Sequence, residues 1–141
     1  MSEQPKLFSE IPDPPRVMSR FEEFLEFHKT TPQVYRRFVE LARAVRSRGI
    51  ERFGARNIWE RLRWEYTIEQ VGGSPKLNDH HVPYYARLAM LREPGLDGLF
   101  VIKDSRFDTD SLSLLEQVEL VEQEHQHGGS ANGGQRRVVG V

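Results

Sequence analysis

The sequence predicts a mainly α-helical, winged-helix-like domain of three to four helices with a short β-ribbon wing. Apolar residues recur at helical spacings of three and four through most of residues 20–92. The best strand candidate, a short β-branched and aromatic run at residues 98–103, follows these helices. Helix, helix, glycine–proline turn, helix and strand is the order of a winged helix, in which the last core helix contacts DNA.

Capping residues predict where the first two helices begin. Ser19 precedes a helix over residues 20–28, and Glu22, three residues after Ser19, completes a capping box. Thr31 and Pro32 open the second helix, because threonine caps helices and proline fits their first turn. The apolar faces are Phe21, Phe24, Leu25 and Phe27 in the first helix, and Val34, Phe38, Leu41, Ala42 and Val45 in the second.

Glycine and asparagine mark the later helix boundaries. Gly49 is suited to the left-handed cap that ends the second helix. A third helix is expected over residues 55–69, and Asn78 with Asp79 caps a fourth that runs to about Arg92. The expected buried positions are Ile58, Trp59, Leu62, Tyr66 and Ile68 in the third helix, and Val82, Tyr85, Ala86, Ala89 and Met90 in the fourth.

Proline, glycine and charge divide the chain into four parts. Residues 1–16 contain four prolines and are expected to be disordered or to lie extended over the core. Residues 17–107 form the winged-helix-like domain, with residues 99–107 as its wing. Residues 108–127 are expected to form a separate acidic helix, and residues 128–141 a disordered Gly/Ser/Asn-rich tail. The apolar stripe of the acidic helix is Leu112, Leu115, Val118 and either Leu120 or Val121.

The composition excludes several classes of protein. The chain has no cysteine, which excludes a disulfide framework, a thiolate zinc site and a cysteine nucleophile. No apolar run approaches the roughly 18 residues of a membrane span, and residues 1–9 lack the apolar core of a secretory signal. We therefore expect a cytoplasmic protein with no membrane contact, metal or cofactor.

Charge is distributed unevenly along the chain. Residues 31–106 carry 14 basic and 9 acidic side chains, a net charge of +5, whereas the flanking segments carry −2 and −4. Twelve of these 14 basic residues are arginine, which makes bidentate phosphate contacts that lysine cannot make. The basic middle of the chain therefore predicts a polyanion-binding surface.

Two interpretations of the arginines remain open, phosphate contact and helix salt bridges. The plausible pairs are Glu40 with Arg36, Arg37 and Arg43, Glu60 with Arg56 and Arg63, and Glu65 with Arg61. Arginines with fewer obvious partners are Arg46, Arg48, Arg52 and Arg87.

The candidate nucleic-acid interface combines the fourth helix with the arginine surface. On the fourth helix, His80, Tyr84 and Arg87 are expected to face the DNA groove. The other candidate contacts are Arg46, Arg48, Arg52, Arg56 and Lys103. Trp59 accompanies the apolar stripe and is expected in the core, whereas Trp64 lies about 140° away around the helix, nearer the arginines.

Residues 79–83 resemble the opening of an HNH nuclease motif, in which a histidine activates water beside a metal. That motif also needs a second histidine and an asparagine on a downstream helix, and after this segment neither type occurs before His125. The favoured interpretation is that Asn78 and Asp79 cap a helix. No set of residues supplies nucleophile, base and stabiliser, so the sequence does not predict an enzyme.

Several short segments between residues 27 and 103 resemble a family of small, uncharacterised bacterial and bacteriophage proteins. They are Phe27-His28, Pro32-Gln33-Val34-Tyr35, Leu41-Ala42, Ile58-Trp59-Glu60-Arg61-Leu62-Arg63-Trp64, Lys76-Leu77-Asn78 and Tyr84-Tyr85-Ala86-Arg87-Leu88. The resemblance implies a compact helical fold and a phage or mobile-element origin, and it brings no catalytic motif.

Two functions follow as hypotheses. The first is a non-enzymatic DNA-binding accessory or regulatory protein, with duplex DNA as partner. The alternative is a protein-interaction module, such as a phage factor that binds a host protein through the acidic helix, residues 111–125, or through the N-terminal arm. The arrangement of the unpaired arginines distinguishes them: one face shared with the fourth helix favours DNA, and scattered arginines favour protein interaction.

Overall fold

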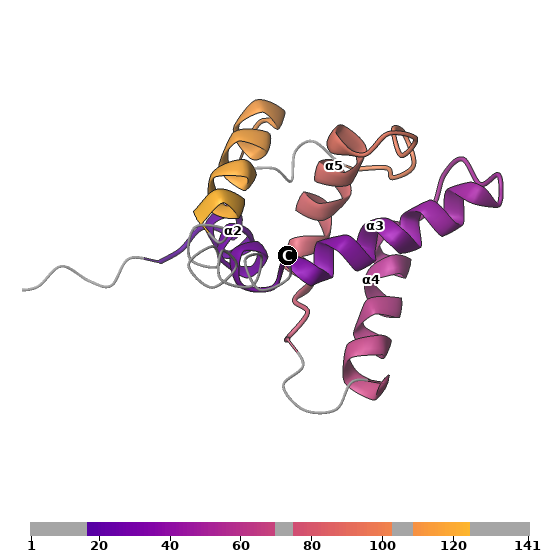
Figure 1. The fold of residues 1–141 in the computed structure, drawn as a ribbon, viewed down its shortest axis with the longest axis horizontal. Coiled ribbons are helices and arrows are strands. Elements are labelled where there is room, and N and C mark those ends of the chain that lie inside the picture. Colours follow the sequence, from indigo (N-terminus) through magenta and orange to yellow (C-terminus); the bar gives the residue numbers. More distant parts are fainter. Residues whose placement is uncertain (1–16, 70–74, 103–108, 125–141) are drawn as a thin grey trace, which may run out of the picture.

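The structure is a computed structural model, and it describes residues 17–69, 75–102 and 109–124. Within these residues the chain is mainly helical, as predicted (Figure 1). The helices are α2 (Arg20–Thr30), α3 (Pro32–Ser47), α4 (Ala55–Trp64), α5 (Val82–Arg92) and an acidic helix over residues 111–124. A π-helical turn, η1 (Glu65–Glu69), follows α4, and a 3-10 turn, η2 (Asp79–His81), precedes α5.

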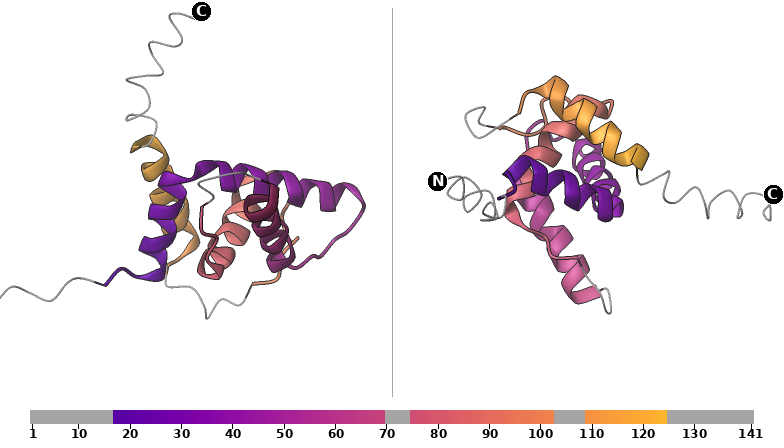
Figure 2. Two further views of the ribbon diagram at one scale, coloured as in Figure 1. Left: turned by 90° about the horizontal axis from the view of Figure 1, so that it is seen from below. Right: turned by 90° about the vertical axis from the view of Figure 1, so that its left-hand side faces the viewer.

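The longest helix, α3, runs across the molecule, and α4 and α5 pack against it (Figure 1). At one end of the molecule, α2 and the acidic helix lie side by side (Figures 1 and 2). No helix among the described residues is long and apolar enough to cross a membrane.

The helix starts follow the predicted caps, with one exception. The Ser19 hydroxyl accepts from the Glu22 amide at 3.1 Å, and the Glu22 carboxylate accepts from the Ser19 amide at 2.9 Å, which confirms the capping box. Pro32 occupies the first turn of α3, as expected. Thr31 occupies the N-cap position of α3 as predicted, but its side chain makes no capping bond, because its hydroxyl donates to the carbonyl of Phe27 in the preceding helix.

The boundaries of α3, α4 and α5 also agree with the sequence. Gly49 has a φ of +82° and ends α3 in the left-handed conformation. The Asn78 side chain accepts from the His80 amide at 3.2 Å and caps the turn that leads into α5. The buried stripe of α4 is confirmed except at Ile68, which is 59% exposed. Ile68 follows the buried Tyr66 by two residues, which puts it on roughly the opposite side of the helix.

Aromatic rings around Tyr85 form the centre of the core. Its ring centroid lies 4.8 Å from that of Phe24, 5.6 Å from that of Tyr35 and 5.9 Å from that of Trp59. Rings from α2, α3, α4 and α5 therefore meet at one point and hold the four helices together. On α5, Val82, Ala86 and Ala89 are buried as predicted, Met90 is only half-buried, and Tyr84 and Leu88 are buried although this was not expected.

The predicted wing strand is wrong for residues 98–102, because residues 98–100 form a turn and bends and residues 101–102 have no regular secondary structure. Leu99 and Phe100 are neighbours and are both buried in the core. The Leu99 amide donates to Leu96 at 3.1 Å, and its carbonyl accepts from the Phe53 amide at 2.9 Å. The rest of the expected wing, residues 103–107, lies outside the described residues, as do the arm over residues 1–16 and the tail over residues 128–141.

The acidic helix packs onto the core instead of standing apart from it. Leu114 and Val118 are fully buried and belong to the same apolar cluster as the other helices. The predicted stripe is correct at Val118 but wrong at Leu112, which is exposed. Leucines occur on two adjacent faces of this helix, so the sequence left its buried face ambiguous.

Candidate functional site

Six of the twelve arginines in the described part of the chain form ion pairs with carboxylates, which neutralises part of the expected DNA surface. Three predicted pairs are present: Arg37–Glu40 at 3.0 Å, Arg61–Glu65 at 3.0 Å and Arg63–Glu60 at 2.6 Å. Other pairs join separate elements: Arg37–Glu65 at 2.7 Å, Arg43–Glu93 at 2.9 Å, Arg56–Asp79 at 2.9 Å and Arg92–Glu122 at 2.8 Å. Hydrogen bonds from Arg37, with further help from Arg61, outweigh burial and lower the pKa of Glu65 to about 2.

Arg46 holds the backbone of two turns together. Its guanidinium donates to the carbonyls of Gly95 at 2.8 Å, Asp97 at 2.6 Å, Glu51 at 2.9 Å and Ile50 at 3.2 Å. All three guanidinium nitrogens are used in these contacts, and they join the turn after α3 to the turn after α5. The side chain expected to contact phosphate has a structural role.

We expect Arg46→Ala to lower the free energy of unfolding by about 1–2 kcal/mol, because several charge-assisted hydrogen bonds are lost at a partly solvated site. Arg48→Ala is the matched control, since Arg48 is exposed, and we expect it to change stability by less than about 0.5 kcal/mol. Chemical denaturation of both variants measures the difference. Equal values for the two variants contradict the structural role of Arg46.

Apart from Arg20, which contacts His80, the exposed arginines without an ion pair in the described part of the chain lie at the two ends of α3. Arg48 and Arg52 lie at the turn between α3 and α4, whereas Arg36 lies in the first turns of α3, at its opposite end. Twelve residues of helix separate Arg36 from Arg48, which is about 18 Å. These three cations therefore do not form one surface.

Helix α5, the fourth helix of the sequence analysis, offers little surface to a DNA groove. Tyr84, expected to face outward, is 3% exposed, and its ring packs 5.0 Å from that of Phe24 and 5.7 Å from that of Phe21. Arg87 is half-buried beside Met90. Lys103 lies outside the described residues. A major-groove helix needs a row of exposed polar side chains, and α5 is instead the central helix of the core.

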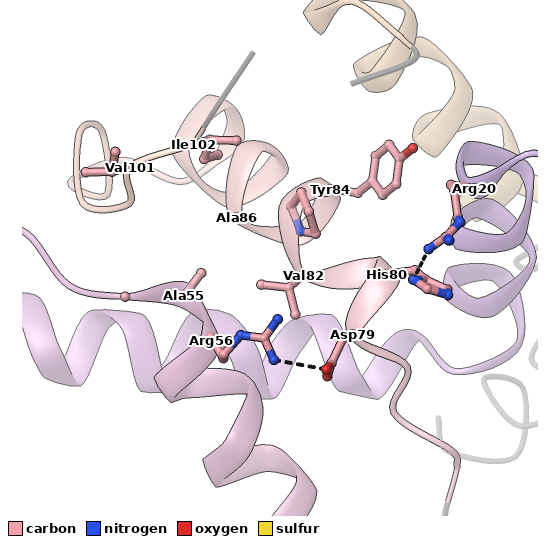
Figure 3. Close-up of a pocket in the computed structure, with 12 residues that line it drawn as sticks. Arg20, Ala55, Arg56, Asp79, His80, Val82, Tyr84, Ala86, Val101 and Ile102 are labelled. Carbon is pink, nitrogen blue, oxygen red and sulfur yellow. Dashed lines mark hydrogen bonds and ion pairs between the residues drawn. The ribbon is translucent and has the colours of Figure 1, made fainter. Parts of the chain in front are cut away.

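The first turns of three helices meet around an open groove of about 670 Å³, which we call the N-terminal groove (Figure 3). It is lined by Arg20 of α2, Ala55 and Arg56 of α4, Asp79 and His80 of η2, Val82 and Ala86 of α5, and Val101 and Ile102. Of the residues predicted as contacts, the groove brings together Arg56, His80 and Tyr84. Arg46, Arg48, Arg52 and Arg87 do not line it.

The N-terminal groove has an apolar end and a basic end. Figure 3 shows Val101 and Ile102 at one end, Arg20 with His80 at the other, and Val82 between them. Val101 is 73% exposed and lines the groove. The groove therefore presents uncovered apolar surface next to cationic groups.

The electrostatics of the N-terminal groove favour a negatively charged ligand. Arg20 contacts His80, and Arg56 contacts Asp79, which also accepts from Arg63 at 2.6 Å. Hydrogen bonds from Arg63 and Arg56 lower the pKa of Asp79, so it stays ionised. Asp79 is the one carboxylate in the described lining, and no side chain caps α4, whose first turn points the positive end of its dipole here.

A buried polar network, absent from the sequence-based site, joins the acidic helix to the core. The His28 ring contacts the Glu122 carboxylate through Nε2 at 2.7 Å and the Tyr85 hydroxyl through Nδ1 at 2.9 Å. Arg92 donates to both oxygens of Glu122, at 2.8 and 2.9 Å. Tyr85 is completely buried, so this network connects helices and does not face a ligand.

Nothing in the described residues assembles the metal site of an HNH motif. His81 is buried and stacks on Phe27 with ring centroids 4.5 Å apart. Burial lowers the pKa of His81 to about 4, which keeps the ring neutral near pH 7. No group of three or more potential metal ligands occurs within residues 17–69, 75–102 and 109–124.

Arg20 is the charged residue of the groove lining, as far as the structure describes it, that the sequence did not single out as functional. The sequence held one indication of its location, because Arg20 directly follows the Ser19 cap and so lies in the first turn of α2. Its contact with His80 joins two segments that lie 60 residues apart, and no local pattern predicts that contact.

No protein-family model matches the chain, and neither does a curated protein or a solved structure.

Proposed function

We propose that this chain is a non-enzymatic protein-interaction module whose docking site is the N-terminal groove. The partner is a peptide segment that carries an aliphatic side chain next to a carboxylate. The observation that carries the proposal is the pairing of uncovered apolar surface at Val101 with the cationic groups Arg20 and Arg56 in one hollow.

The chemistry of the groove matches each part of such a segment. A mostly apolar hollow with a few convergent polar groups is the usual form of a ligand site. Covering an exposed aliphatic side chain such as Val101 contributes about 1.5 kcal/mol or more. Arg20 and Arg56 supply guanidinium groups for the carboxylate through the donors that their contacts with His80 and Asp79 leave over, and the first turn of α4 adds its positive end.

Two features favour this function over DNA reading by α5. The face of α5 that would enter a major groove is largely buried, Tyr84 included. The exposed arginines Arg36, Arg48 and Arg52 are scattered over the described surface. The acidic helix, an alternative contact in the sequence analysis, uses Leu114 and Val118 to pack on its own core.

The test is a display library of random peptides panned against the full chain. We expect enrichment of peptides in which Ile, Val or Leu lies within a few residues of Asp or Glu. An enriched peptide is then labelled, and its affinity is measured by fluorescence polarisation. Val101→Glu and Arg56→Ala are each expected to weaken binding about tenfold, which corresponds to roughly 1.4 kcal/mol.

The matched control is Leu112→Glu. Leu112 is 67% exposed, like Val101, but it lies on the acidic helix and not in the groove. We expect this variant to leave peptide affinity unchanged. Enrichment of basic peptides, or binding that is insensitive to Val101→Glu, overturns the proposal.

Phosphate-dominated binding of duplex DNA is the second candidate function. Its supporting observation is that Arg48 and Arg52 are both exposed at one turn and have no ion pair in the described part of the chain. Binding of this kind falls steeply with salt and ignores sequence. A gel shift of random duplex by the full chain at low salt, weakened by joint replacement of Arg48 and Arg52 with alanine, supports it. No shift at low salt eliminates it.

A further inference from the structure

The described chain begins at Val17, and Arg20, three residues later, already lines the N-terminal groove. The segment just before it contains Glu10, Ile11 and Asp13, an aliphatic side chain between two carboxylates. This is the chemistry that the groove is suited to bind. The arm is also joined covalently to the groove's basic end.

We infer that residues 10–13 of this chain occupy the N-terminal groove in cis, so that an external partner must displace them. The inference rests on the proposed function, because it uses the same groove and the same ligand chemistry. It adds a regulation of that site: the arm acts as a built-in competitor.

The two surfaces are complementary in charge and in polarity. Ile11 fits the end formed by Val101 and Ile102, and Asp13 or Glu10 fits Arg56 or Arg20 at the basic end. The aliphatic chain covers exposed apolar surface, and the carboxylates meet guanidinium groups beside the uncapped start of α4.

The arm is long enough to reach. Asp13 precedes Arg20 by seven residues and Ile11 precedes it by nine. An extended chain spans at most about 3.3–3.6 Å per residue, so these segments reach about 23 and 30 Å. Since Arg20 itself lines the groove, the arm can fold back along it with length to spare.

Proline reduces the entropic cost of docking. Pro12 and Pro14 restrict Ile11 and Asp13 to extended conformations, and Pro15 continues the stiff stretch. A segment with fewer conformations loses less entropy when it binds. A short tether also gives an effective concentration in the millimolar range, so even weak complementarity occupies the groove.

The absence of cysteine allows a clean test in the full chain. Ser9→Cys allows a nitroxide spin label to be attached next to the proposed docking segment. The NMR signals of the backbone amides of Ala55, Ala86 and Ile102 then report whether the label lies near the groove. We expect these signals to be broadened by the label. The control chain adds Ile11→Ser and Asp13→Asn, which remove the aliphatic group and a carboxylate, and the broadening should disappear.

A second measurement uses a synthetic peptide of residues 8–15 as the probe in trans. We expect it to bind the chain with Ile11→Ser and Asp13→Asn about tenfold more tightly than the unmodified chain, because the competitor is weakened. Val101→Glu, added to that chain, should abolish this binding.

The outcomes separate this inference from the proposed function. If display-selected peptides bind through Val101 while the label broadens nothing and the arm substitutions bring no gain in affinity, the inference fails and the groove keeps its proposed function. If neither the selected peptides nor the peptide of residues 8–15 binds, both fail. Broadening that persists in the control chain also overturns the inference.

Discussion

Trp59→Ala is expected to lower the free energy of unfolding by about 3–5 kcal/mol, whereas Trp64→Ala should cost less than about 0.5 kcal/mol. The two residues lie on the same helix, α4, five positions apart. Trp59 is fully buried among the rings of Phe27, Phe38 and Tyr85, and Trp64 is 56% exposed. Removing a large side chain from a packed interior loses its transfer free energy and leaves a cavity, and neither loss applies at an exposed position.

Trp59→Phe sharpens this test. The indole Nε1 of Trp59 is buried and has no hydrogen-bond partner among the described residues. Phenylalanine removes that unsatisfied donor while it keeps most of the ring, so the loss of stability should be much smaller than for alanine. Urea denaturation, followed by circular dichroism, compares the three variants. Equal destabilisation by Trp59→Ala and Trp64→Ala contradicts the assignment of the buried face of α4.

Local signals in the sequence predicted the helices well. The Ser19–Glu22 box, Pro32, Gly49 and Asn78 each act within one helical turn, and a cap is the same in any fold. Periodicity likewise found the buried face of α4. Such information is complete in a short window of sequence, so the tertiary structure had little to override.

Long-range contacts decided the features that the sequence could not give. Arg46 reaches carbonyls about 50 residues away, and Glu122 meets His28 across 94 residues. The run that begins at Gly98 forms a turn, bends and irregular chain instead of a strand, and Leu99 and Phe100 both pack into the core. Intrinsic strand preference is weak compared with the burial of two large apolar side chains.

The candidate site likewise combines residues that local sequence indicates with contacts that depend on the tertiary structure. His80 and Arg56 were singled out from local sequence, but for contact with DNA. Their meeting with Arg20 and Val101 depends on how α2, α4, α5 and the turn after α5 come together. An arginine count cannot distinguish a phosphate surface from an ion-paired one, because the acidic partners Glu93, Asp79 and Glu122 lie far away in sequence.

Glu122→Ala is expected to detach the acidic helix and to lower the free energy of unfolding by about 2–4 kcal/mol. The substitution leaves His28 and Arg92 without their shared carboxylate in a largely buried site. Glu124→Ala is the matched control on the same helix, because Glu124 is 62% exposed and its contact with Lys29 at 3.4 Å lies at the surface. That control should cost less than about 0.5 kcal/mol.

The same carboxylate gives the fold a definite acid sensitivity. Burial alone would raise the pKa of Glu122, but hydrogen bonds from His28 and Arg92 outweigh it and lower the pKa to about 2. A carboxylate with a lowered pKa in the folded state contributes stability that is complete above its unfolded pKa of 4.5 and is lost as the pH falls toward 2. The change from 4.5 to about 2 corresponds to a loss of about 3 kcal/mol. Between pH 6 and pH 2, the free energy of unfolding should therefore fall less with decreasing pH for Glu122→Gln than for the unmodified chain. Glu124→Gln should show the same pH dependence as the unmodified chain. Identical pH profiles for all three proteins show that Glu122 does not hold the acidic helix in place.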